Sequence, residues 1–241
     1  MTERIDEAKQ AIRERVWALL DEHGVVQPPG AAGHIPAFAG ADEAAARLAD
    51  LPQWKAARVV KANPDRAQLP VRVQALREGK LLYMAVPALA TEQPFYLLNP
   101  DDLDAVFEVA ASSKGAAQAG RRVGVDEMRP VNVVVCGSVA VNGEGARIGK
   151  GAGYSDIEVA LLTEARLFSN ETTVVTTVHD LQVLDEAIPE TEHDFSVDVV
   201  VTPERVIHCG NPRRPRGLYW DHLSESKIAA IPALAMRQTG W

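Results

Sequence analysis

Apolar residues near the start of the chain recur at helical spacing. Ile5, Ile12 and Val16 share one face, with charged residues between them, which predicts a helix from about Glu3 to Glu22. The same spacing predicts further helices over residues 42–50, 71–77 and 101–111, from the glycine run near residue 150 to about 166, and over 224–237, where Pro232 interrupts the pattern.

Short runs of β-branched and other apolar residues lie between these helices. The clearest, Val131 to Cys136, has five apolar residues in six and predicts a buried strand. Further strands are predicted over residues 58–61, 80–86, 172–178, 197–201 and 206–207. Strands that alternate with helices favour an α/β fold with a mainly parallel sheet and helices on both faces. Ligands of such folds bind beyond the carboxyl ends of the strands.

The composition narrows the class of protein. Of the 241 residues, 46% are apolar, which is enough to bury a full core, and the net charge of −8 argues against a nucleic-acid binder. Two cysteines, Cys136 and Cys209, are too few for a disulfide scaffold. No apolar signal region opens the chain and no apolar run approaches membrane length, so we expect a soluble, cytoplasmic protein without a membrane partner.

The run from Arg147 to Asp156 carries the most chemistry. Three glycines alternate with other residues between a predicted strand and a predicted helix. Glycine permits close backbone approach and positive φ, and the N–H groups of such a loop before a helix favour an anion. Arg147 and Lys150 add positive charge, while Asp156 would repel a bare phosphate and is better suited to a metal that bridges phosphate oxygens. The alternative is a solvated glycine loop without a ligand.

Three motifs together resemble the 5-formyltetrahydrofolate cyclo-ligase family, also called methenyltetrahydrofolate synthetases. They are the Lys-x-x-apolar-Arg pattern at Lys9–Arg13, the glycine loop at 147–156, and the apolar strand with an early Asp at 197–203. The likeness to the branch of methenyltetrahydrofolate synthetase domain-containing proteins covers most of the chain. It rests on residues 34–36, 61–65, 137–141, 147–151, 178–180 and 193–194. The resemblance implies a Rossmann-like three-layer α/β sandwich.

The resemblance also implies a reaction in which ATP and Mg²⁺ activate the formyl oxygen of 5-formyltetrahydrofolate, so that 5,10-methenyltetrahydrofolate forms. The nucleotide would be bound by Lys9, Arg13, Arg147, Gly149, Lys150, Gly151, Gly153, Tyr154 and Ser155. Arg147 and Lys150 would act in catalysis, and Asp65, Lys150 and Tyr154 would contact the reduced folate. Asp156 and Asp198 would approach one another and share one Mg²⁺.

Each of these residues also has a simpler interpretation. Lys9 and Arg13 could form a solvated helix face, Asp65 could be an ordinary turn residue, and Asp198 a strand-end charge. His179 and His193, each followed by Asp, are interpreted as structural.

The chain departs from the family pattern mainly where the substrate would bind. Ser155 replaces a second Tyr of the family loop, Asp65 replaces a longer Glu, Ala88 stands where an Arg is common, and Asn142 where an Asp is common. Two alternatives therefore stay open: an enzyme with the same phosphoryl chemistry on another small molecule, or a non-catalytic nucleotide- or folate-binding regulator.

The C-terminal part differs in composition from the rest. Residues 210–217 are basic and rich in proline, and an apolar helix pattern follows. We expect residues 1–209 to form one α/β domain, with 210–241 as a linker and a helix that packs on the same domain. The sequence indicates no particular oligomeric state.

Overall fold

A large sheet forms the centre of the computed structural model, which describes residues 2–210 and 212–238. Within these residues the sheet has eight strands in the order β11-β10-β8-β5-β1-β2-β3-β4. In that order their bounds are Val206–His208, Val199–Val201, Thr173–Thr177, Val133–Cys136, Val59–Ala62, Leu81–Ala85, Phe95–Leu98 and Arg121–Val123.

The middle of this sheet is parallel and its edges are antiparallel. The neighbouring strands β10, β8, β5, β1 and β2 all run in the same direction. By contrast, β11 pairs antiparallel with β10, and β3 and β4 extend the other edge in the same antiparallel way. The predicted mainly parallel sheet is confirmed. Strands β3 and β4 were missed because they are short; β3 comes directly after Pro94, and β4 comes directly after Gly120.

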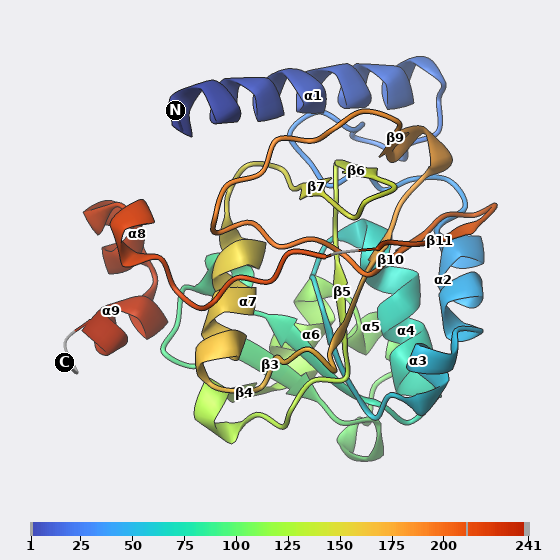
Figure 1. Cartoon of the computed structure of the whole chain (residues 1–241). Coiled ribbons are helices and arrows are strands. Elements are labelled where there is room, and N and C mark those ends of the chain that lie inside the picture. The colour runs from blue at the N-terminus through green and yellow to red at the C-terminus, as the bar shows by residue number, and fades with distance from the viewer. Residues whose placement is uncertain (1, 211, 239–241) are drawn as a thin grey trace.

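Helices cover both faces of the sheet (Figure 1). In β5, Val133 and Val135 join one apolar cluster, and Val134 and Cys136 join the other, because successive side chains of a strand point to opposite faces. The first cluster includes residues of helices α1 to α6, and the second includes residues of α7 to α9. The helix bounds are α1 Thr2–Glu22, α2 Ala41–Ala49, α3 Pro52–Ala56, α4 Leu69–Arg77, α5 Phe107–Ala110, α6 Ser113–Ala119, α7 Tyr154–Glu164, α8 Glu225–Ala230 and α9 Pro232–Gln238. The predicted three-layer α/β arrangement is therefore confirmed.

A second, small sheet positions the glycine loop. Its strands β6 (Ala140–Asn142) and β7 (Arg147–Ile148) form an antiparallel pair, and β9 (Val183–Leu184) runs parallel to β6. Helix α1 lies across this small sheet in Figure 1. Consequently the end of β7, where the glycine run starts, is brought beside α1 although about 140 residues separate them in sequence.

Two predicted helices differ from the structure. Residues 101–111 contain a 3₁₀ turn at Pro100–Asp102 and only the short α5, because the apolar Val106 and Val109 stay 67% and 56% exposed and provide no buried stripe. The predicted helix over 224–237 is divided at Ile231, which is extended (φ −117°, ψ 96°) ahead of Pro232. A residue that precedes proline is disfavoured in the helical region.

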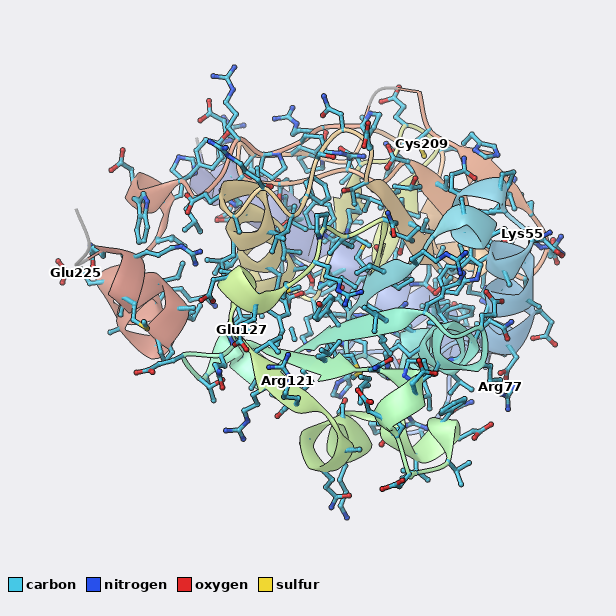
Figure 2. All side chains as sticks on the ribbon, turned by 90° about the horizontal axis from the view of Figure 1, so that it is seen from below. Lys55, Arg77, Arg121, Glu127, Cys209 and Glu225 are labelled. Carbon is cyan, nitrogen blue, oxygen red and sulfur yellow. The ribbon has the colours of Figure 1, made fainter. Side chains whose placement is uncertain are left out.

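The last two helices bury part of their surface on the α7 side of the sheet. Ile228, Ile231 and Leu234 belong to the same apolar cluster as the buried face of α7. Charged side chains such as Lys55, Arg77 and Arg121 lie at the outside of the molecule (Figure 2). Within the described residues no helix is both long and apolar enough to cross a membrane.

Candidate functional site

A cleft of about 540 Å³ opens at the carboxyl ends of three parallel strands. Asn63 follows β1, Val86 follows β2 and Gly137 follows β5, and all three line the cleft. This is the position at which open parallel sheets bind ligands. Every site residue predicted from the sequence lines this cleft, with the exception of Asp198.

The glycine loop closes one side of the cleft and packs against α1. Gly151 (φ 100°) and Gly153 (φ 70°) adopt the left-handed conformation that favours glycine. Arg13 Nε donates a hydrogen bond to the carbonyl oxygen of Gly149 (2.8 Å), and a Cβ on Gly151 would lie only 3.4 Å from Arg13 Cζ. Gly153 precedes α7 without a side-chain cap. The first N–H groups of α7 therefore remain available to an anion.

Arg147 is a buried cation held in one orientation. Its side chain is almost fully enclosed; Nε donates to Ser138 Oγ (3.3 Å) and Nη2 to the carbonyl oxygen of Gly137 (3.1 Å). The guanidinium also lies 4.7 Å from the ring centroid of Phe195. These neutral partners fix the guanidinium in place, and its charge faces the cleft, where the Asp156 carboxylate lies 3.6 Å away.

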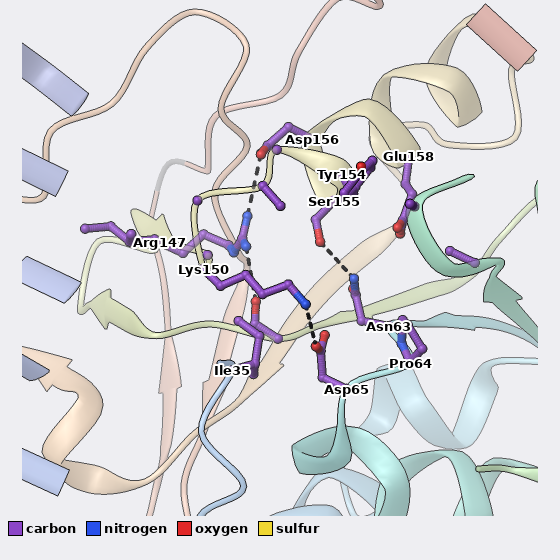
Figure 3. A pocket seen from close by; sticks show the side chains of 18 of the residues that line it. Ile35, Asn63, Pro64, Asp65, Arg147, Lys150, Tyr154, Ser155, Asp156 and Glu158 are labelled. Atoms are coloured by element: carbon purple, nitrogen blue, oxygen red, sulfur yellow. Dashed lines mark hydrogen bonds and ion pairs between the residues drawn. The ribbon is translucent and has the colours of Figure 1, made fainter. Parts of the chain in front are cut away.

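Asp156 has an unsatisfied oxygen beside this cation. Its Oδ1 is buried without a hydrogen-bond partner, and Arg147 Nη1 lies 3.6 Å away, too far for a hydrogen bond (Figure 3). Burial raises the pKa of Asp156; Arg147 opposes this rise, and the negative charge of Asp194 adds to it. A buried carboxylate in this setting gains from a further cation.

Asp194 is a further carboxylate of the cleft, and the sequence prediction did not assign it to the site. It pairs with the buried Lys9 at 2.5 Å and accepts hydrogen bonds from the N–H and hydroxyl of Thr191. Burial would raise the pKa of Asp194, but the hydrogen bonds from Lys9 and Thr191 outweigh burial and lower it overall. The adjacent pair His193-Asp194 was the feature of the sequence that could have indicated a role for Asp194 in the site.

The two carboxylates suit Mg²⁺ bound together with phosphates. Among the described residues no cluster of three or more His, Cys, Asp or Glu side chains could enclose a metal ion by itself. Mg²⁺ commonly takes only one or two protein carboxylates and completes its shell with water and substrate phosphate oxygens. Asp156, with its unpartnered Oδ1, and Asp194 are the residues of the cleft that could hold such an ion.

The structure contradicts the predicted pairing of Asp156 with Asp198. Asp198 stands immediately before β10, at the amino end of the parallel strands, whereas Asp156 lies in the first turn of α7 at their carboxyl end. Both oxygens of Asp198 accept hydrogen bonds from Arg214 Nη2 (2.6 and 2.5 Å), and Oδ2 also accepts from the N–H of Val174. Asp198 is therefore a structural anchor for the basic linker, and its charge is already satisfied.

Two further contacts join residues that line the cleft. Lys150 Nζ lies 3.6 Å from Asp65 Oδ1, and Asn63 Nδ2 donates to Ser155 Oγ at 2.8 Å (Figure 3). The Lys150 side chain is 44% exposed, so its ammonium is free to exchange Asp65 for a ligand. Ser155, by contrast, is held by an amide that comes from the end of β1.

A buried ion pair beneath the cleft was not predicted. Lys61 of β1 hydrogen-bonds Glu158 of α7, with side chains only 0% and 4% exposed, and Lys61 Nζ also lies 3.4 Å from Asn63 Oδ1. Burial raises the pKa of Glu158, and Lys61 opposes the rise. The signal in the sequence was a charge inside each of two apolar runs, Val59–Ala62 and Ile157–Leu162.

The two histidines interpreted as structural have different surroundings. His179 Nδ1 accepts a hydrogen bond from the N–H of Leu181 (3.2 Å), which caps a short 3₁₀ turn away from the cleft. His193 lines the cleft; one ring nitrogen lies 3.0 Å from Thr191 Oγ1, and the other lies 3.1 Å from Nδ1 of His222.

Comparison with known proteins identifies relatives of this chain. Methenyltetrahydrofolate synthase domain-containing protein of Mus musculus is 39% identical over 236 residues, which cover 94% of this chain and 62% of the relative. The Homo sapiens protein of the same name is 37% identical over 237 residues, covering 94% of this chain and 60% of its own length. The chain thus spans less than two thirds of the length of these relatives.

A solved structure and a family model agree with this likeness. The NMR structure of Aquifex aeolicus 5,10-methenyltetrahydrofolate synthetase matches with a TM-score of 0.53 at 21% identity, covering 90% of this chain and 99% of that one, which supports the fold. The model of the 5-formyltetrahydrofolate cyclo-ligase family matches residues 5–203. The resemblance expected from the motifs is confirmed, and the chain belongs to the 5-formyltetrahydrofolate cyclo-ligase family.

Proposed function

We propose that this chain is an ATP- and Mg²⁺-dependent cyclo-ligase that converts 5-formyltetrahydrofolate to 5,10-methenyltetrahydrofolate. One observation carries the proposal: four cations from three elements converge on one cleft at a glycine loop, and two of the cleft's carboxylates lie directly beside these cations. The cations are Lys9 and Arg13 of α1, Arg147 of β7 and Lys150 of the loop; the carboxylates are Asp156 and Asp194. Phosphoryl transfer depends on such positioning and charge neutralisation.

The nucleotide would bind along the glycine loop. Lys9, Arg13 and Arg147 would neutralise phosphate oxygens, together with the first N–H groups of α7. Asp156 and Asp194 would hold Mg²⁺, which supplies charge neutralisation between phosphate oxygens when bound. Arg147 is suited to orient the transferred phosphoryl group, because hydrogen bonds to neutral groups fix the guanidinium and the neighbouring Asp156, at 3.6 Å, makes no hydrogen bond to it.

The substrate would enter from the side of Asp65 and Lys150. The formyl oxygen attacks the γ-phosphorus and ADP leaves; N10 then attacks the activated carbon and loses its proton, and the carbon–oxygen bond breaks to release phosphate. Lys150 would move from Asp65 to the transferring phosphoryl oxygens, where its exposed ammonium can stabilise charge in the transition state. Tyr154 and Asp65 would orient the folate.

A second candidate is the same phosphoryl chemistry on another small molecule. The observation that favours it is the hydrogen bond between Asn63 and Ser155, which fills the position where the family loop carries a second Tyr. A smaller polar side chain, fixed by its neighbour, leaves a differently shaped pocket for the acceptor.

The test is turnover of the purified chain with ATP, Mg²⁺ and a panel of reduced folates. Methenyl absorbance and phosphate release are recorded in parallel, and the melting temperature is measured with and without Mg-ATP. We expect ATP to raise the melting temperature, and 5-formyltetrahydrofolate to yield equal amounts of methenyl product and phosphate. Phosphate release with another acceptor alone would favour the second candidate. Stabilisation by ATP without any turnover would point to a regulator.

Two matched variants test the metal assignment. Asp156→Asn should lower turnover at least about tenfold and raise the Mg²⁺ concentration for half-maximal rate, because a neutral amide is a weaker Mg²⁺ ligand than a carboxylate. Asp198→Asn makes the same chemical change at the amino end of the parallel strands, away from the cleft, and should leave the Mg²⁺ dependence unaltered. Equal Mg²⁺ dependence in the wild type and in Asp156→Asn would contradict the assignment.

A further inference from the structure

The C-terminal segment, residues 217–227, is fastened to both ends of α7. Near one end, the N–H of Leu218 donates to Glu164 Oε1 at 3.0 Å. Near the other, Lys227 Nζ donates to the carbonyl oxygen of Ala152 at 2.7 Å and lies 3.7 Å from the ring centroid of Tyr154. The segment therefore runs alongside α7 as far as the glycine loop, and α8 begins there (Figure 1).

A pocket of about 290 Å³, here named the side pocket, lies between this segment and α7. Ile157 and Ala160 of α7 form one wall, and Leu218, Tyr219 and Leu223 form the other. Sites for small organic ligands are concave and mainly apolar, with a few polar groups that fix orientation, and begin at about this size. The lining is thus suited to an uncharged ring system.

The side pocket adjoins the metal and phosphate half of the main cleft. Gly153, Asp156 and His193 line both. Asp65 and Lys150, on the proposed substrate side, line only the main cleft. One ligand can therefore place one part in the side pocket and another part beside Asp156 in the main cleft. A nucleotide has such parts, since its base and its phosphates belong to one molecule.

The polar groups at the side pocket suit a flat, neutral heterocycle. Tyr219 stacks on His222 with ring centroids 5.4 Å apart and planes 20° from parallel, and His222 Nδ1 lies 3.1 Å from His193 Nδ1. Aromatic faces bind bases by stacking, and histidine nitrogens can exchange hydrogen bonds with a heterocycle. Lys227 is the lysine of this lining, and its ammonium already contacts Ala152 and Tyr154.

We propose that the side pocket binds the purine base of the nucleotide whose phosphates occupy the main cleft. The inference rests on the proposed function for the phosphates, and goes beyond it by making the C-terminal segment part of the nucleotide site. The match to the family model ends at residue 203, so this wall of the site lies outside it. Tyr219 is then a determinant of nucleotide affinity.

Calorimetric titration of the full chain with Mg-ATP and with Mg-tripolyphosphate separates the base from the phosphates. We expect ATP to bind at least about tenfold more tightly than tripolyphosphate. Tyr219→Ala should remove most of that difference and leave tripolyphosphate affinity unchanged. The neighbouring Trp220 does not line the side pocket, so Trp220→Ala, the matched control, should retain it.

A second variant covers the case in which Tyr219→Ala does not fold. Ala160→Leu fills the side pocket from α7 and should weaken ATP about tenfold without affecting tripolyphosphate. Equal affinities of ATP and tripolyphosphate for the wild type, or equal losses for both ligands in either variant, would overturn the inference while leaving the proposed function intact. If neither ligand binds, the proposed function fails as well.

Discussion

The buried ion pair between Lys61 and Glu158 yields the sharpest stability prediction. Lys61 lies in β1, between β5 and β2, and its side chain is fully buried; the Glu158 side chain is 4% exposed. Glu158→Leu would leave the ammonium with only Asn63 Oδ1, 3.4 Å away. Removal of one partner of a buried pair leaves an uncompensated charge and costs about 3–5 kcal/mol. We expect a loss of that size in the free energy of unfolding.

The stability of the variant that removes the other partner, Lys61→Met, should depend on pH. In Lys61→Met the opposing cation is gone, so burial keeps the pKa of Glu158 above its ordinary value in the folded protein. Because the pKa of Glu158 is higher in the folded state than in the unfolded state, protonation of this carboxyl favours folding. This contribution to stability is complete below the unfolded-state pKa and is lost as the pH rises through the folded-state pKa. Lys61→Met should therefore be less stable at pH 8 than at pH 5, relative to the wild type.

Urea denaturation of the wild type, both single variants and Lys61→Met/Glu158→Leu measures the coupling. The double variant removes both charges, so we expect it to recover most of the loss, with an interaction free energy of a few kcal/mol. Losses in the double variant equal to the sum of the single losses would refute the reasoning. A cost below about 1 kcal/mol for Glu158→Leu would do the same, because it would mean that water solvates Lys61.

Three further predictions concern single side chains. Lys150→Ala should lower turnover at least about tenfold and shift the melting temperature by no more than a few degrees, because the side chain is 44% exposed; a large melting shift with unchanged kinetics would contradict its electrostatic role. Asp198→Asn should lower the free energy of unfolding by about 1–2 kcal/mol, measured in urea, because the pair with Arg214 is partly buried; unchanged stability would show that the pair is weak. Burial, with the charge of Asp198, raises the pKa of Cys209 to about 11, so its alkylation should be slow at pH 8 and rise about tenfold per pH unit until that value; a rate that levels off near pH 9 would show an ordinary thiol.

Local sequence patterns predicted those helices, strands and loops whose own residues are enough to specify them. Every residue of the run Val133–Cys136 is apolar, as is typical of a strand buried on both faces, and this strand forms the centre of the parallel sheet. The glycines at 149, 151 and 153 required a tight loop before a helix, and Gly151 and Gly153 do adopt positive φ there. Because the loop follows a strand and precedes a helix, the position of the cleft could also be expected.

The tertiary structure decided which distant side chains meet. Asp194 and Asp198 are four residues apart, and the sequence pattern favoured Asp198 as the partner of Asp156. The chain folds so that Asp194 reaches Lys9 at the carboxyl end of the sheet, whereas Asp198 starts β10 at the amino end and pairs with Arg214. Four residues are enough for the chain to pass from the carboxyl ends of the parallel strands to their amino ends, and no local sequence pattern predicts that passage.

The same limit explains the buried pair and the C-terminal wall. A lysine in a strand and a glutamate in a helix 97 residues later reveal no partner until β1 and α7 are packed together. Lys227 likewise gains its contact with Ala152 only because residues 217–227 return along α7. Spacing and residue type determine secondary structure and the chemistry that is available. The pairing of charges across long separations depends on packing, because each ion is stable in the interior only where the fold supplies its counter-charge.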